Sequence, residues 1–131
     1  EVHLDASYDE ALEQVAAALK TEGFGILTRI DVRSTLKEKL GQEFRPYAIL
    51  GACNPPLAHR ALAHNALTGL LLPCNVTVES DPAGGVLVRV GDPDTLLSVG
   101  DLGSDPILKG VAAEARLKLQ RVVKSLKDLA R

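Results

Sequence analysis

The chain has 131 residues, of which 46% are hydrophobic and 24% are charged, and its formal net charge is −2. This length is enough to bury a core without metal ions or disulfides, so we predict a single domain over residues 1–131. The composition excludes a disordered chain, and the small negative charge gives no general attraction to nucleic acid or to anionic membranes.

Location is predicted from what the sequence lacks. Its apolar runs fall well short of the roughly 20 residues that span a bilayer, so we predict no membrane span. The chain starts without the basic and then apolar pattern of a signal peptide, and its two cysteines suit a reducing compartment. We therefore predict a cytoplasmic protein.

The first forty residues predict two strands and two helices in alternation, over residues 2–4, 8–22, 24–30 and 32–40. Ser7 and Glu10 form a capping box at the start of the first helix, and Gly23 stops it. Residues spaced i, i+3, i+4 and i+7 give this helix one apolar face, made of Leu12, Val15, Ala16 and Leu19. Asp31 caps the second helix, and Gly41 ends it.

The stretch between residues 47 and 78 holds both cysteines and two of the three histidines. Tyr47 to Cys53 is a short apolar run bounded by breakers, which favours a buried strand. Asn54 is a preferred N-cap residue and Pro55 suits a first helical position, so a helix is expected from Pro55 to about Asn65. A second strand is expected from Leu70 to Val78, with Cys74 near its start.

The remaining residues predict a hairpin followed by two helices. Two β-branched runs, 76–78 and 86–90, flank a Gly-rich turn. Asp92 caps a short helix that Gly100 ends, and residues 101–104 form a connecting loop. A long helix follows over residues 106–129, with a continuous apolar stripe of Leu108, Ala112, Ala115, Leu119, Val122, Leu126 and Leu129.

This order of elements predicts a two-layer α+β fold, in which helices cover one side of a largely antiparallel sheet. The N-terminal helix and the long C-terminal helix form the second layer. Such an architecture carries many unrelated functions and does not select one.

Chemistry is concentrated around Cys53, Cys74 and His59. Cys53 precedes the N-terminus of a predicted helix, where free N–H groups favour an anion such as a thiolate. His59 lies in the same helix, and Cys74 starts the next strand. Thiolate and imidazole are the ligands that Cu(I) and Zn(II) prefer, so these three residues are candidate ligands of a soft metal ion.

Three other interpretations of the two cysteines stay open. They can be small buried hydrophobes, the commonest state of a free cysteine. They can serve a thiol or redox enzyme with Cys53 as nucleophile, although the sequence specifies no partner base. They can also belong to a homodimeric interaction or small-ligand module without chemistry of its own, which is the interpretation we favour. Enzymatic activity is left open but not favoured, because phosphate loops, zincin motifs and nucleophile elbows are missing.

Two segments around the cysteines, with the upstream run from Glu22 to Asp31, resemble the bacterial and archaeal family catalogued as domain of unknown function 302. The resemblance covers roughly residues 2–125. It rests on a Gly-x-x-Asn-Pro turn and a Leu-Pro strand start, found here at Gly51, Asn54, Pro55, Leu72 and Pro73. It implies a compact α+β domain, often dimeric, with a curved antiparallel sheet against a long C-terminal helix, and it brings no established activity.

The turn and the cysteines together define a candidate ligand pocket, made of Gly51, Cys53, Asn54, Pro55, His59, Pro73 and Cys74. No cofactor is specified by these residues beyond the possible soft metal ion.

Self-association is predicted from apolar residues beyond the main stripe of the long helix, namely Ile107, Leu117 and Val123. A twofold dimer is the commonest way to bury such a surplus. The basic residues of the same helix are expected to face solvent, and with only two Tyr and two Phe to stack on bases we do not expect nucleic-acid binding.

Overall fold

A computed structural model of the chain describes residues 1–129, apart from the side chain of Asp101. The strands in this part of the chain are β1 (Val2–Leu4), β2 (Gly25–Asp31), β3 (Tyr47–Cys53), β4 (Cys74–Ser80) and β5 (Val86–Val90). They form one sheet in the order β1-β5-β4-β3-β2, and each neighbouring pair is antiparallel. The predicted α+β class with an antiparallel sheet is confirmed.

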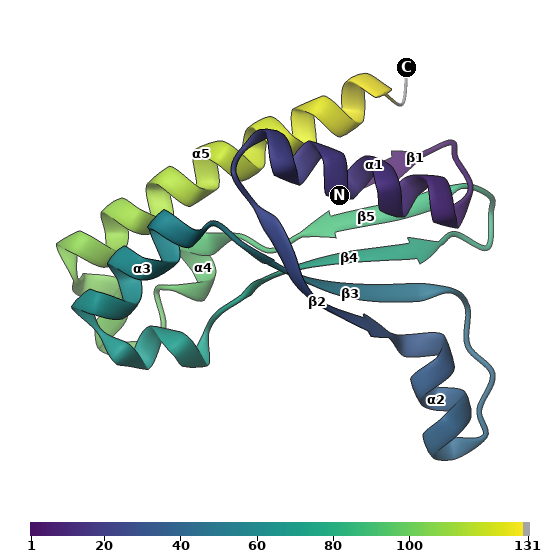
Figure 1. Cartoon of the computed structure of the whole chain (residues 1–131), viewed down its shortest axis with the longest axis horizontal. Helices are drawn as coiled ribbons and strands as arrows, with labels where there is room; N and C mark the ends of the chain where they lie inside the picture. The colour runs from purple at the N-terminus through teal and green to yellow at the C-terminus, as the bar shows by residue number, and fades with distance from the viewer. Residues whose placement is uncertain (130–131) are drawn as a thin grey trace.

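The helices are α1 (Tyr8–Thr21), α2 (Val32–Leu40), α3 (Pro55–His64), α4 (Pro93–Leu96) and α5 (Pro106–Leu129), with short 3₁₀ helices η1 (Ala66–Leu70) and η2 (Gly100–Ser104). Figure 1 shows α1 and α5 on the same side of the sheet, where they contact one another. The predicted second layer of the N-terminal and C-terminal helices is therefore confirmed. At its other end α5 packs against α3 and α4.

The helix starts follow the predicted capping residues. The Ser7 hydroxyl accepts from the Glu10 N–H at 3.1 Å, and an Asp31 carboxylate oxygen accepts from the Ser34 N–H at 3.0 Å. Each bond satisfies an N–H group that the first turn of a helix leaves without a partner. Gly41 ends α2 with φ +65°, a left-handed conformation that glycine adopts without steric cost.

The main core lies between the sheet and the pair α1 and α5. Alternate residues of β1, β3, β4 and β5 face it, as in Ala48, Leu50 and Ala52 of β3, which are at most 2% exposed. A second cluster joins α3 to the first half of α5, through Leu57, Ala61, Leu108, Val111 and Ala115. This cluster holds α3 beside the C-terminal end of β3 and the start of β4.

Two predicted helix faces are partly wrong. In α1 the buried residues are Ala11, Val15, Ala18 and Leu19, whereas Leu12 and Ala16 are only half-buried. Helical spacing fits two adjacent stripes, the predicted one and one that includes Ala11 and Ala18. Because α1 contacts α5 as well as the sheet, the stripe with Ala11 and Ala18 is the one that becomes buried. In α5, Val111 is buried and Leu129 is 58% exposed, because Leu129 lies beyond Leu126, the last residue of α5 in the main core.

The strand predicted from Leu70 to Val78 is wrong in its first half. Residues 66–70 form η1, and β4 begins only at Cys74. Pro73 precedes it after a cis peptide bond with Leu72, and a proline has no N–H to donate to a sheet. Likewise α4 ends at Leu96 rather than at Gly100, and the predicted loop 101–104 is part of η2.

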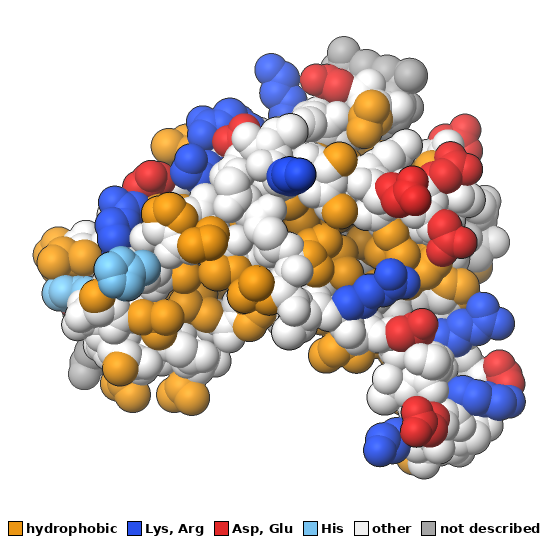
Figure 2. Space-filling view, viewed as in Figure 1, with side chains coloured by type: hydrophobic (Ala, Val, Ile, Leu, Met, Phe, Trp, Pro, Cys, Tyr) orange, Lys and Arg blue, Asp and Glu red, His pale blue; other side chains and the backbone are white. Residues whose placement is uncertain are grey.

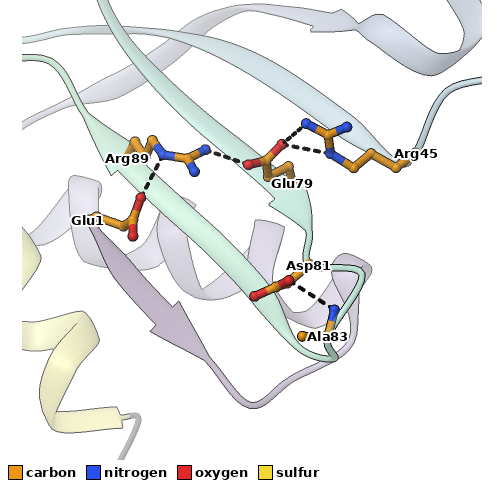
Figure 3. A network of polar contacts seen from close by, with 6 residues as sticks. All are labelled: Glu1, Arg45, Glu79, Asp81, Ala83 and Arg89. Carbon is orange, nitrogen blue, oxygen red and sulfur yellow. Dashed lines mark hydrogen bonds and ion pairs between the residues drawn. The ribbon is translucent and has the colours of Figure 1, made fainter.

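The face of the sheet opposite α1 and α5 carries a network of ion pairs (Figure 3). Glu79 of β4 is only 4% exposed and accepts hydrogen bonds from Arg45 and Arg89 on either side. Arg89 also donates to Glu1 at 2.8 Å. Because each buried carboxylate oxygen has a guanidinium partner, Glu79 stays ionised while it crosslinks β4, β5 and the segment before β3.

Within residues 1–129, the helices are all too short or too polar to cross a membrane.

Candidate functional site

A cavity of about 320 Å³ lies where β3 ends and β4 begins. Ala52, Cys53 and Cys74 contribute from the strands, and one side of α3 contributes Leu57, Ala58, Ala61 and Leu62. The other walls come from four further segments, with Phe24 and Leu27, Leu71 to Pro73, Pro93, Leu96 and Leu97, and Val111 and Ala115 of α5. Its volume falls within the range of ligand pockets, roughly 300–1,000 Å³.

The rim of this cavity is apolar and exposed. Leu27 and Leu62 line the cavity and are 67% and 42% exposed, and Leu67 and Leu70 of the adjoining η1 are 61% and 82% exposed. Figure 2 shows hydrophobic side chains gathered over α3 and the segment after it, and continuing toward the middle of the molecule. Apolar patches on a protein surface mark places where a ligand or another surface binds.

Leu27 reaches the rim because of an irregularity in β2. The register between β2 and β3 shifts between Ile26 and Thr28, so Leu27 has no directly paired residue on β3. A bulge of this kind redirects a side chain away from the regular alternation of a strand. It adds one apolar residue to the cavity from the edge of the sheet.

Both cysteines line the cavity, and both are free and half-buried. Cys74 pairs with Ala52, so Cys53 is the next residue along the neighbouring strand. Burial raises the pKa of the Cys74 thiol, and the negative charge of a Cys53 thiolate raises it further. At neutral pH the Cys74 side chain is therefore a neutral thiol and a weak nucleophile.

The start of α3 lacks the free N–H groups that the sequence led us to expect beside Cys53. Pro55 and Pro56 have no N–H group, and the Leu57 N–H donates to the Asn54 side chain at 3.4 Å. The next N–H, of Ala58, donates to the Asn54 carbonyl at 2.9 Å. The expectation that this helix end stabilises a thiolate through unpaired N–H groups is wrong, because the cap and the prolines remove them.

Four of the predicted pocket residues line the cavity: Cys53, Asn54, Pro73 and Cys74. Gly51, Pro55 and His59 are not among the lining residues that the structure describes. Gly51 instead gives room to its neighbours, since a Cβ there would lie 2.2 Å from Thr28 Oγ1 and 2.7 Å from Pro73 Cγ.

The predicted metal ligands Cys53, His59 and Cys74 do not form one group. Within the described residues, no three His, Cys, Asp or Glu side chains are arranged to hold a metal ion. His59 is exposed on α3, whose buried residues are Leu57 and Ala61. His64, farther along the helix, pairs with Asp105 at 2.5 Å between Nε2 and Oδ2, and Asp105 caps the start of α5.

Sequence reasoning missed most of the apolar lining, including Phe24, Leu27, Leu96, Leu97, Val111 and Ala115. These residues come from five elements or connections, and no local motif links them. Their apolar character is visible in the sequence, but their convergence depends on how α5 packs against α3 and α4.

Comparisons with known proteins agree with this fold. A family model described as "Domain of unknown function DUF302" matches residues 1–126. A crystal structure of an uncharacterized conserved DUF302 protein from Bacillus stearothermophilus is similar, with a TM-score of 0.83 and 33% sequence identity, over 95% of this chain and 94% of that chain. No curated protein matches. The predicted resemblance is confirmed, and the chain belongs to the family of domain of unknown function DUF302.

Proposed function

We propose that this protein binds a small apolar ligand in the cavity between α3, α5 and the ends of β3 and β4. One observation carries the proposal. The side chains of the described lining residues are hydrocarbon except for those of Cys53, Cys74 and Asn54, and the rim is formed by exposed leucines.

The energy of such binding comes from removing apolar surface from water. A ligand that buries about 200 Å² of apolar surface gains roughly 5 kcal/mol at about 25 cal/mol per Å². Wall atoms that leave water at the same time add to this, and the loss of ligand freedom subtracts from it. A net gain of about 5 kcal/mol corresponds to a dissociation constant of roughly 0.2 mM, so affinities in the sub-millimolar range are expected for ligands that fill the cavity.

A fluorescence titration with the neutral probe N-phenyl-1-naphthylamine tests the proposal. Ala58 lines the cavity and is half-buried, whereas Ala63 is exposed on the same helix and is not among the described lining residues. The variant Ala58→Leu should weaken probe binding at least about fivefold by filling the cavity, and Ala63→Leu should leave it unchanged. Leucine and alanine both favour helix, which makes the pair a matched comparison. Absence of saturable binding, or equal effects of the two variants, would refute the proposal.

A second candidate function is binding of a soft metal ion, supported by the presence of Cys53 and Cys74 on the same cavity. Thiolates favour Cu(I), which accepts two ligands, whereas structural Zn(II) sites require four. Anaerobic Cu(I) titration against a competing chelator tests this candidate. Cys53→Ser and Cys74→Ser should each abolish competitive binding, and His59→Ala should not. Binding that survives both serine variants would reject the candidate.

We also propose that the protein is a homodimer. The edge strand β2 supports this, because all seven of its residues are exposed and its far side has no strand beside it in the described sheet. Ile107 and Leu117 of α5 are exposed as predicted, but Val123 is half-buried against the main core and contributes no surplus apolar surface.

We also propose a cytoplasmic location, because free cysteines are typical of a reducing compartment and both cysteines of this chain are free.

A further inference from the structure

We infer that the cavity selects uncharged ligands and rejects anions that carry the same apolar part. This inference rests on the proposed ligand binding and specifies its chemical class. It concerns ligands small enough to lie inside the cavity, so that a charged group cannot remain in bulk water.

The first argument is the chemistry of the cavity wall. None of the lining residues that the structure describes carries a formal charge. Asn54 supplies an amide, but one of its two Nδ2 N–H groups donates to the Glu22 carbonyl at 3.2 Å and its Oδ1 accepts from the Leu57 N–H. A carboxylate inside the cavity would lose its hydration without gaining a cationic partner among the described lining residues, which costs far more than an apolar group of the same size gains.

The second argument is the start of α3, which reaches the cavity at Asn54. Helix N-termini bind anions through N–H groups that have no partner within the helix. In α3, prolines occupy the first two positions, and the N–H groups of Leu57 and Ala58 are both bonded to Asn54. The usual anion site of a helix is therefore closed at the point where a ligand would reach it.

The third argument concerns the arginines that neighbour lining residues in the sequence. Arg60 lies between Ala58 and Ala61 on α3, and it forms an ion pair with Glu114. Arg116 follows Ala115 on α5, and its Nη1 lies 2.8 Å from Asp94 Oδ2. Neutralising a bound anion with either guanidinium would require breaking an existing ion pair.

Two ligands with one ring system test the inference. In displacement of N-phenyl-1-naphthylamine at about pH 8, where a carboxylic acid is fully ionised, 1-naphthalenemethanol should compete with a dissociation constant at least about tenfold lower than that of 1-naphthoate. Equal or tighter competition by 1-naphthoate would overturn the inference and leave the proposed function standing. If neither the two ligands nor the probe bound, the proposed function and this inference would both be refuted.

A designed cation gives an independent readout. Leu62 lines the cavity at its rim, so Leu62→Lys places an ammonium group there, whereas Ala63→Lys places one on the exposed side of the same helix. The first variant should improve 1-naphthoate binding at least about fivefold relative to 1-naphthalenemethanol, and the second should not change this ratio. If both variants, or neither, changed the ratio, rejection of anions by the cavity wall would be refuted.

Discussion

The side-chain amide of Asn54 donates a hydrogen bond to the carbonyl oxygen of Glu22, 3.2 Å away, and so ties the start of α3 to the end of α1. The same side chain caps α3 and is only 8% exposed. Gly23 follows Glu22 with φ +82°, and a Cβ at that position would lie 3.1 Å from Asn54 Nδ2. Asn54 thus fixes α3, one wall of the cavity, relative to the end of α1.

Replacing Asn54 by alanine should lower the free energy of unfolding by about 0.5–2 kcal/mol for the lost cap, and further for the lost bond to Glu22. Ser7→Ala is the matched control, because Ser7 caps α1 through one exposed hydrogen bond. Urea unfolding of the two variants compares them. If Asn54→Ala cost no more than Ser7→Ala, the link between α1 and α3 would contribute nothing to stability.

Glu79 should make the protein sensitive to acid. The hydrogen bond from Arg89 holds the pKa of Glu79 below its ordinary value of 4.5, burial opposes this, and Arg45 adds to the lowering. Between the folded and unfolded pKa values the unfolded chain binds more protons, so stability rises with pH in that window. The contribution is fully present above the unfolded pKa and is lost as pH falls through the folded one.

The variant Glu79→Gln should remove this part of the pH dependence, measured by urea unfolding between about pH 3 and pH 7. Glu43→Gln serves as control, because Glu43 pairs with Lys37 on the surface, where both side chains are well exposed. The free energy of unfolding of Glu79→Gln could still fall with decreasing pH as steeply as that of the wild type, or both variants could change this dependence equally. Either result would assign the acid sensitivity to other groups.

The Cys74 thiol should require unusually alkaline solution before it reacts, since burial and then the charge of Cys53 raise its pKa above 9.0. The variant Cys53→Ser isolates Cys74, and its rate of reaction with a disulfide reagent should keep rising with pH above that value. The same variant removes the charge of Cys53, which is the smaller of the two causes that raise the Cys74 pKa. A rate that levels off near neutral pH would mean that Cys74 is not buried as described.

The proposed dimer is tested on β2. Leu27 and Ile30 are 67% and 50% exposed on this edge strand. The double variant Leu27→Lys, Ile30→Lys should give a monomer by light scattering, because charges on an edge strand oppose pairing with a second copy. Leu117→Lys on α5 is the control for general loss of apolar surface and should stay dimeric. A monomeric wild type would reject the dimer, and a monomeric Leu117→Lys with an unaffected β2 variant would move the interface to α5.

Elements with strong local signals were predictable from the sequence. The Asp31 cap and Gly41 bound α2, and the valines of β5 flank a turn rich in glycine. These signals work because caps and turns depend on a few adjacent residues. The failures lie where tertiary packing decides, as in the face of α1 that becomes buried, and in residues 66–70, where a strand was expected and η1 forms.

The candidate site was predictable only in part for the same reason. Cys53, Asn54 and Cys74 were found because unusual residue types flank the breaks between β3, α3 and β4. His59 was included because it lies in the helix that begins beside Cys53, but the rotation of α3 leaves it exposed. The apolar walls were missed, because Phe24, Leu97 and Val111 resemble any other core residues until the chain brings them together.

Gly51 provides a last test of how the site is built. It lies in the middle of β3, between Thr28 of β2 and Pro73 before β4, and its missing side chain lets both approach. Gly51→Ala should therefore destabilise the protein, because a Cβ would lie 2.2 Å from Thr28 Oγ1 and 2.7 Å from Pro73 Cγ. Backbone conformation is not the cause, since Gly51 is not among the glycines with positive φ.

A double-mutant cycle separates this steric cause from a general intolerance of the strand. Thr28→Ala removes the hydroxyl that approaches closest, so it should recover part of the stability lost in Gly51→Ala, by about 1 kcal/mol or more of coupling in urea unfolding. Thr77→Ala is the control, because Thr77 pairs with Ile49 on the same strand and is not among the atoms nearest a Cβ at Gly51. Equal coupling for Thr28 and Thr77 would place the cost of the substitution elsewhere. Selective rescue by Thr28→Ala would show that the missing side chain of Gly51 lets Thr28 of β2 and Pro73 pack closely against β3, beside the cavity.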